Sequence, residues 1–584
     1  MQPPDQASWI RRHERLLLLL LLVGVILPRA TFLFRQDEGV VAIPVLDDGF
    51  YNLTIARNIA TGKGFTFDGT GVTTGFHPLV VLVAVPVFAL CGGGTLMPLR
   101  IILTFYVLLG ILLAWMIYRL VRHLAGPGPG LAALLMYATA SGTGVLLNTL
   151  NGCDSVIGGV LLITTVWYYL TRVRCEADPP VRRYLVVGFL GGSLGLARLD
   201  LGIFAAFLGL DLFLVRMRCR PLRIGRLAGF GLTGLATVIP WVVFNLAMTG
   251  RPLPDNGRAV TMISRATAPY EVRLGEGGLL RTIGGNLTPS LAGAEPYDDD
   301  RPPASFYRTM VAHAVLAYLH DTPHTGIAST LGTLLERGLD IAGLKAWSTS
   351  LRRTGFHLIL NLCLAGLLLI LLLLRHRRLA DLPALRQVWF LLPAGIILFL
   401  AYPLVVFGAW FLGRYYFPLA LITLIYTPVF ATLLWRSWTP GRVALFSGVF
   451  IGAFLLDTAP GLLNPVPRNF YNQARRIATH LPENAVIGAV QAGHLGFFCP
   501  QRVINLDGKV STAAYRALAE RRVLEYARSR GVRYITDWPM LVELLILLRS
   551  DPADRARMVR LEPPPASPES CSPLGWVTYS LATR

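Results

Sequence analysis

The sequence predicts an all-α polytopic membrane protein with about eleven transmembrane helices, followed by a small C-terminal extracytoplasmic α/β domain. Of the 584 residues, 53% are hydrophobic and only 15% are charged, whereas about a quarter are charged in ordinary soluble domains. The apolar residues form uninterrupted runs, such as residues 16–26 and 364–374, which are typical of segments in lipid. Alternating strand and helix patterns occur only near the C-terminus. The predicted domains are residues 1–458, with outer loops at 35–97 and 248–353, and residues 459–584.

The charge balance indicates a membrane topology rather than nucleic-acid binding. The chain has 54 basic and 34 acidic residues, a net charge of +20. Its arginines form short clusters between the apolar runs, as in cytoplasmic loops, whereas a nucleic-acid-binding protein gathers them in one stripe. The seven cysteines show no CxxC pair and no metal-ligand spacing, and Cys499 and Cys571 could form a disulfide only in an oxidising compartment.

The first apolar run, residues 16–34, follows Arg11, Arg12 and Arg15 and lacks a small-residue cleavage site. It predicts an uncleaved anchor with a cytoplasmic N-terminus. Ten further spans are predicted near residues 98–118, 130–147, 156–172, 184–197, 200–216, 227–246, 355–374, 388–407, 416–435 and 443–458. Arginine-rich connections alternate with arginine-poor ones in this order, so both outer loops and the C-terminal domain fall on the outer side.

Two parts of the membrane region are too short for ordinary spans. Residues 184–197 and 200–216 are separated by Arg198 and Asp200, which we expect to form an internal ion pair at a helix break, and one of the two segments could be a partial span. Residues 79–90 are apolar but too short to cross a membrane. We expect them to form an interfacial helix on the outer side.

The C-terminal region has the pattern of a small α/β domain. Residues 485–490, 502–506 and 532–537 are short β-rich runs, and residues 512–530 and 539–548 have helical patterns. We expect His494 and Asp507 in this domain to be structural or to lie on the acceptor side of a site, because the domain shows no dense acid–base cluster.

The first outer loop carries the candidate catalytic groups. Asp47 and Asp48 precede a predicted helix, residues 49–60, and Arg57 lies nine residues after Asp48 on that helix. A carboxylate and an arginine within reach of one substrate supply a base and an anion clamp. The alternative is structural, with Asp48 as the N-cap of the helix and Gly62 at its end.

Further polar residues could bind substrate. Lys63, Arg258 and Arg414 are candidate phosphate ligands, although each could instead be a solvated charge or a contact to lipid headgroups. Tyr415 follows Arg414 in a short connection between two spans, which suits the interface. His77 before Pro78 could hydrogen-bond substrate or fix the turn into the interfacial helix.

Several motifs, taken together, carry a resemblance to a known family. They are the stretch from Asp47 to Pro78, Asn151-Gly-Cys-Asp154-Ser, Ala197-Arg-Leu-Asp200, Pro240-Trp241 with Pro252-Leu-Pro254 and Gly257-Arg258-Ala259, and Gly413-Arg414-Tyr415-Tyr416-Phe-Pro418. In this order they resemble the C class of integral-membrane glycosyltransferases, in particular the bacterial mannosyl-, arabinosyl- and aminoarabinosyl-transferase branch. Ala492–Gly496 and Asn505–Gly508 resemble the outer domain of some of these members.

The resemblance implies an inverting sugar transfer at the outer face of the bacterial plasma membrane, from a polyprenyl-phosphate-linked donor to a glycan, lipid or protein acceptor. It implies that a carboxylate accepts the proton of the acceptor hydroxyl. Asp48 is the first candidate for this carboxylate, and Asp47 is the second. Basic side chains, for which the candidates are Arg57, Lys63, Arg258 and Arg414, would stabilise the departing phosphate. Asp154 stands where relatives more often carry a glutamate; it is a candidate substrate contact, or alternatively the N-cap of a span.

Two other classes of function stay open at this stage. A membrane transporter or lipid-linked glycan flippase would show related halves and mid-membrane ionisable residues, and neither is evident. A non-catalytic membrane scaffold is disfavoured only by the clustering of acid, base and aromatic groups. No cofactor is required by the sequence. A divalent metal stays open because Asp298, Asp299 and Asp300 form an acidic run. The alternative for this run is a solvated turn, which is the usual structure of three consecutive carboxylates on a loop.

Overall fold

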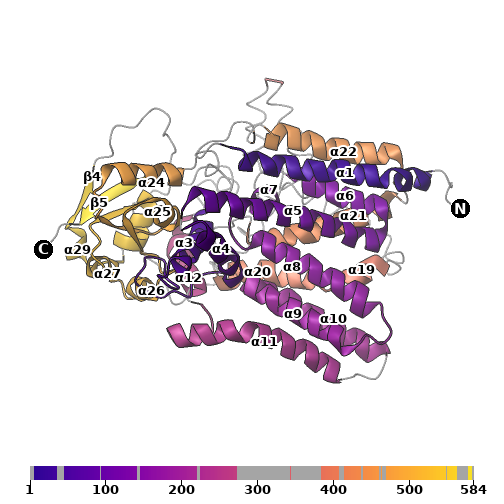
Figure 1. The fold of residues 1–584 in the computed structure, drawn as a ribbon, viewed down its shortest axis with the longest axis horizontal. Helices are drawn as coiled ribbons and strands as arrows, with labels where there is room; N and C mark the ends of the chain where they lie inside the picture. Colours follow the sequence, from indigo (N-terminus) through magenta and orange to yellow (C-terminus); the bar gives the residue numbers. More distant parts are fainter. Residues whose placement is uncertain are drawn as a thin grey trace.

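The computed structural model shows a bundle of helices with a small α/β domain at one end (Figure 1). It describes residues 6–35, 45–92, 94–140, 145–219, 224–254, 256–271, 342–343, 383–406, 414–435, 438–459, 462, 469–547, 549–561 and 576–581. The N-terminus lies at the end of the bundle that is distant from the C-terminal domain (Figure 1). The predicted span at 355–374, the acidic run at 298–300 and Cys571 lie outside the described residues.

Four of the described helical segments are long and apolar enough to cross a membrane. They are α1 (Gln6–Leu33), α5 (Leu96–Ala125), α8 (Ser155–Tyr168) with its π-helical continuation η1 (Tyr169–Arg174), and α11 (Ile224–Thr249). A span needs about 20 mainly apolar residues, and each of these segments provides them. The described helices therefore identify a multi-pass membrane protein.

Shorter helices occupy the other predicted spans that fall within the described residues. They are α6 (Pro127–Thr139), α9 (Val181–Ala197), α10 (Gly202–Cys219), α20 (Leu391–Ala401) with η4 (Tyr402–Val406), α21 (Phe417–Trp435) and α22 (Pro440–Ala453). The apolar segment near residue 80 forms α4 (Pro78–Leu90), a helix of 13 residues. Because several of these helices are short, the number of eleven spans stays a prediction.

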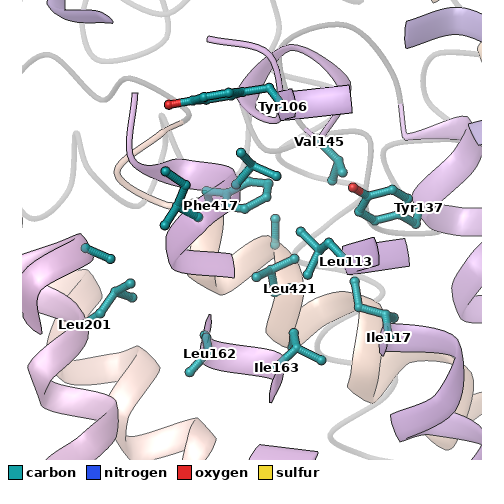
Figure 2. Packing of buried hydrophobic residues seen from close by; sticks show 14 of the residues in the cluster. Tyr106, Leu113, Ile117, Tyr137, Val145, Leu162, Ile163, Leu201, Phe417 and Leu421 are labelled. Atoms are coloured by element: carbon teal, nitrogen blue, oxygen red, sulfur yellow. The ribbon is translucent and has the colours of Figure 1, made fainter. Parts of the chain in front are cut away.

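The helices pack through a continuous apolar core. Leu113 of α5, Ile163 of α8 and Leu421 of α21 point toward one another (Figure 2). Gly159 allows this approach, since a Cβ atom at this position would lie only 3.0 Å from the side chains of Leu113 and Phe417. Close packing of this kind fixes the ends of α8 and α21, which carry polar residues of the site described below.

The break between α9 and α10 agrees with the expectation for residues 198–200. Arg198 ends α9, a short turn η2 (Leu199–Leu201) follows, and α10 begins at Gly202. The guanidinium of Arg198 and the carboxylate of Asp200 form an ion pair with Nη2 and Oδ2 2.5 Å apart. The predicted ion pair at the helix break is confirmed.

The C-terminal domain contains a five-stranded mixed sheet with the order β2-β1-β3-β5-β4. Its strands are β1 (Val486–Ala489), β2 (Arg502–Asn505), β3 (Tyr534–Asp537), β4 (Met558–Leu561) and β5 (Val577–Leu581). Strand β1 is parallel to both β2 and β3, and β5 is antiparallel to β3 and β4. The sequence predicted the three parallel strands but neither strand of the antiparallel edge.

The helices of this domain differ from the prediction in two ways. The segment 512–530 is not one helix but two, α26 (Thr512–Ala519) and α27 (Val523–Ser529), because Arg521 between them has φ 57°. Two unpredicted helices, α24 (Asn469–His480) and α25 (Gly493–Phe498), pack against each other, and α25 faces the bundle. The helical segment after β3 is present as α28 (Pro539–Leu541) and η6 (Val542–Leu547).

Helix α3 (Asp47–Ala60) joins the two domains, because it packs against α25. The ring of Phe50 lies 4.3 Å from the ring of His494 and 5.0 Å from that of Phe497, measured between centroids. The hydroxyl of Tyr51 donates to the carbonyl of Val490 at 3.0 Å. The first turn of α3 therefore lies at the junction of the bundle and the C-terminal domain.

Candidate active site

The start of α3 is fixed by close contact with the loop before α8. The N–H of Leu46 donates to the carbonyl of Asn151 at 3.0 Å. A Cβ atom at Gly49 would lie 2.7 Å from that same carbonyl oxygen, so only glycine fits there. This contact brings the first turn of α3 against the loop that leads to Asp154, although the two segments are distant in sequence.

Asp48 does not cap α3, contrary to the structural alternative. The helix begins at residue 47, two residues earlier than predicted, Leu46 occupies the N-cap position, and no side chain caps the helix. The carboxylate of Asp48, in the first turn, instead forms an ion pair with the guanidinium of Arg414. Gly62, with φ 78°, lies at the other end of the helix, as expected.

Arg414 is held in the turn before α21. Its side chain is only 10% exposed, while that of Asp48 is 24% exposed. Nη2 of Arg414 also donates to the hydroxyl of Tyr415 at 2.9 Å, and Nη1 lies 3.5 Å from the sulfur of Cys153. One face of the Asp48 carboxylate is thus closed by Arg414, while the carboxylate as a whole stays accessible.

The electrostatics keep Asp48 ionised. Burial alone would raise the pKa of Asp48, but the positive charges of Arg414 and Lys509 outweigh burial and lower this pKa to about 2. The ammonium of Lys509 lies 3.7 Å from Oδ1 of Asp48. A carboxylate between two cations can accept a hydrogen bond from a hydroxyl, and the two cations can bind an anionic group.

Arg198 organises the base of this site. Its Nε lies 3.0 Å from Oδ2 of Asp154, and its Nη1 donates to the carbonyl of Arg414 at 2.6 Å. Its Nη2 donates to the hydroxyl of Tyr402 at 2.8 Å. Asp154 makes no side-chain cap to α8, so its partner is Arg198 and not the helix N-terminus. Arg198 therefore fixes the backbone that carries Arg414.

The C-terminal domain also contributes ionisable groups, of which His494 and Asp507 were singled out in the sequence and Lys509 was not. Oδ1 of Asp47 accepts the N–H of His494 at 2.7 Å and lies 2.9 Å from Nδ1 of the same residue. Lys509 lies between Asp48 and Asp507, with its Nζ 3.3 Å from Oδ2 of Asp507. The motif Asn505–Gly508 ends one residue before Lys509, and only the tertiary contact distinguishes this lysine from a surface residue.

The other basic candidates lie in different surroundings. Both terminal nitrogens of Arg57 donate to backbone carbonyls of α25, those of Gly496 and Phe497, at 2.9 Å each. Lys63 is exposed in the loop after α3. Arg258, on α12 (Asn256–Glu271), is exposed, and its guanidinium lies 5.1 Å from the ring centroid of Tyr515. The structure thus gives none of these three a contact with Asp48.

His77 stands at the edge of the cluster. It is the N-cap of α4, and its N–H donates to Oδ1 of Asn52 at 3.0 Å, which supports the structural role expected for it. Its ring also makes a small contribution to the lowered pKa of Asp48. The structure therefore brings together Asp48, Arg414, Tyr415 and Asp154 from the predicted set, with His77 beside them.

Two further expectations concern metals and cysteines. Within the described part of the chain, no three His, Cys, Asp or Glu side chains lie close enough together to hold a metal ion. Cys499 has a free thiol, with its sulfur 3.5 Å from the carbonyl of Ala474. Its proposed disulfide partner, Cys571, is not among the described residues.

The fold and the site define a multi-pass membrane protein with a charged acid–base cluster at its junction with a C-terminal domain.

A family model described as "Domain of unknown function (DUF8728)" matches residues 467–576. No curated protein matches the chain. Several solved structures are similar to it at low identity, among them an oligosaccharyltransferase and ArnT. The apo oligosaccharyltransferase of Archaeoglobus fulgidus is 14% identical, with 91% of this chain and 70% of that chain covered and a TM-score of 0.47. ArnT from Cupriavidus metallidurans bound to undecaprenyl phosphate is 13% identical, with 98% of each chain covered and a TM-score of 0.45.

Proposed function

We propose that the protein is a glycosyltransferase that moves a sugar from a polyprenyl-phosphate donor to an acceptor at the outer face of the bacterial plasma membrane. The observation that carries this proposal is the Asp48 carboxylate, partly exposed between Arg414 and Lys509. A donor with an anionic phosphate next to a reacting carbon needs cations for the phosphate and a base for the attacking hydroxyl, side by side. The motif resemblance described above independently favours the same reaction.

The reaction is a single displacement. The acceptor oxygen forms a bond to the anomeric carbon, the bond from that carbon to the phosphate oxygen breaks, and its electron pair stays on the phosphate. Asp48 orients the acceptor hydroxyl and takes its proton, and Arg414 stabilises the negative charge that develops on the leaving phosphate. One displacement inverts the anomeric configuration.

The ion pair also accounts for how Asp48 becomes a base. With a pKa of about 2, the carboxylate is ionised but a weak proton acceptor. A bound phosphate competes for Arg414 and adds a negative charge nearby, and both effects raise the pKa of Asp48. Donor binding therefore prepares the carboxylate to accept the proton.

The proposal is tested by lipid analysis and by transfer with purified protein. A strain without the protein should accumulate its sugar-loaded polyprenyl phosphate, and mass spectrometry of the lipids would identify the sugar. Purified protein in detergent should then transfer this sugar to an extract of acceptor, whereas Asp48→Asn should not. A flippase would also cause donor to accumulate, but it would show no transfer in detergent, and that result would contradict the proposal.

A further inference from the structure

A loop of the C-terminal domain, residues 505–510, enters the site of the membrane domain. Its backbone touches the first outer loop, because a Cβ atom at Gly75 would lie only 1.7 Å from the carbonyl oxygen of Lys509. The amide of Asn505 donates to the hydroxyl of Tyr51 on α3 at 3.2 Å. Because the loop is in contact with the first outer loop through backbone atoms, its position relative to α3 is well defined.

The loop holds Lys509 in a set orientation. Asp507 is fully buried, its Oδ1 accepts the N–H of Lys509 at 2.8 Å, and its Oδ2 lies 3.3 Å from the ammonium. Gly508 has φ 81°, and a Cβ atom there would lie 2.6 Å from the backbone of Tyr515, so no other residue fits without strain. The side chain of Lys509 is 25% exposed and reaches the same carboxylate as Arg414.

Building on the proposed function, we infer that Lys509 is a second ligand of the donor phosphate, supplied by the C-terminal domain and acting with Arg414. The two cations lie on either side of Asp48, one from each domain. An anionic phosphate placed beside Asp48 would meet both, and the ammonium of lysine is a compact point charge suited to phosphate. Asp507 is then a positioning residue, because it aligns the lysine.

The docking of the domain does not depend on Lys509. Asp47 contacts His494, Arg57 contacts Gly496 and Phe497, and Asp68 forms an ion pair with Arg530 at 2.8 Å. All of these join the first outer loop to the C-terminal domain. Loss of the lysine ammonium should therefore leave the domains together, and ligand affinity can be measured separately from docking.

The test measures binding of a short-chain polyprenyl monophosphate, without sugar, to the full-length protein in detergent by calorimetry. Lys509→Met keeps the length of the side chain and removes its charge, and we expect affinity to fall about tenfold or more. Lys509→Arg should retain most of the affinity. Arg516→Met is the matched control, since Arg516 is an exposed cation on α26 in the same domain, and it should bind like the parent.

The outcomes separate this inference from the proposed function. If Arg414→Ala weakens binding and Lys509→Met does not, the phosphate site exists without the lysine and this inference is wrong. If neither variant weakens binding, the proposed function itself fails. An equal loss in Arg516→Met would show a general charge effect and would also overturn the inference. So would a Lys509→Met protein with a lowered melting temperature and unchanged affinity, because the lysine would then be only a docking contact.

Discussion

The carboxylate of Asp47 lies 2.9 Å from Nδ1 of His494, a residue 447 positions further along the chain. The next residue, Asp48, turns the other way and pairs with Arg414 of the membrane domain. Two adjacent carboxylates at the start of one helix therefore have different partners, and Asp48, which also lies 3.7 Å from the ammonium of Lys509, is in contact with both domains. Asp47 holds the C-terminal domain in place, and Asp48 is left as the group with access to substrate.

This division predicts different results for two conservative substitutions. Asp48→Asn keeps the size of the side chain but removes the base, so transfer should fall about a hundredfold to ten-thousandfold, with little change in the melting temperature. Asp47→Asn, the matched control, should lower the melting temperature more and activity per folded molecule less, because its oxygens accept the N–H groups of Gly493 and His494. Near-parental transfer by Asp48→Asn, measured with the native donor, would show that Asp48 is not the base.

Substitutions of Arg414 should reduce turnover in graded steps. Arg414→Lys keeps the charge but cannot reach Asp48, Tyr415 and Cys153 at once, so turnover should fall about tenfold. Arg414→Ala should lower turnover about a hundredfold or more, because it removes a group that stabilises the charge developing on the phosphate. Steady-state kinetics should show a larger effect on turnover than on the acceptor KM. Unchanged turnover and donor affinity in both variants would make Arg414 an interfacial anchor only.

Stability should depend on pH through Asp537, at the end of β3. Burial raises the pKa of Asp537 to about 7, opposed in part by the N–H groups of Gln491, Trp538 and Val490. Since the usual value is about 4, the folded protein holds an extra proton between these pH values. The associated stability is complete below about pH 4 and is lost as the pH rises through about 7.

Thermal melting of the full-length protein from about pH 4 to about pH 8 would show this dependence. The melting temperature of the parent should fall relative to that of Asp537→Asn as the pH rises, because asparagine does not titrate. Asp551→Asn is the control, since Asp551 is an exposed N-cap of α29 (Pro552–Arg555) and asparagine caps equally well. Parallel curves for the parent and Asp537→Asn would rule out a raised pKa at Asp537.

Cysteine labelling in spheroplasts should show the orientation of the chain. Cys175 is exposed in the connection between η1 and α9, which the arginine pattern assigns to the cytoplasm. An impermeant maleimide should leave Cys175 unmodified until the membrane is permeabilised. It should label Lys63→Cys at once, because residue 63 is exposed on the first outer loop. The opposite pattern would invert the topology and move the site to the cytoplasmic side.

Much of the fold was predictable because its signals are local. Apolar runs identified the helices that overlap α5, α8 and α11, since the free energy of a segment in lipid depends mainly on its own side chains. The parallel strands β1, β2 and β3 were also predicted from short β-rich runs. Strands β4 and β5 were missed, because Met558–Leu561 has no clear alternation of burial and acquires its structure by pairing with β5.

The candidate site was predictable only in part, for a related reason. Asp48 and Arg414 were proposed from residue type and from their place beside predicted spans, and the structure brings them together. Arg57 was proposed in the same way, yet it binds carbonyls of α25, a helix that the sequence did not predict. Residue type alone could not distinguish an arginine that binds substrate from one that joins two domains.

By itself, the sequence determined the membrane class, the order of the helices and the presence of acidic and basic groups on the first outer loop, because each depends on neighbouring residues. Only the tertiary structure decided which groups meet. Asp48 is joined by Arg414 from the turn before α21 and by Lys509 from the C-terminal domain, and Arg198 fixes the backbone that carries Arg414. Such contacts depend on the packing of segments that are distant in sequence. A shift of a few ångströms between these segments would separate the charges. A local sequence pattern does not predict the distance between them.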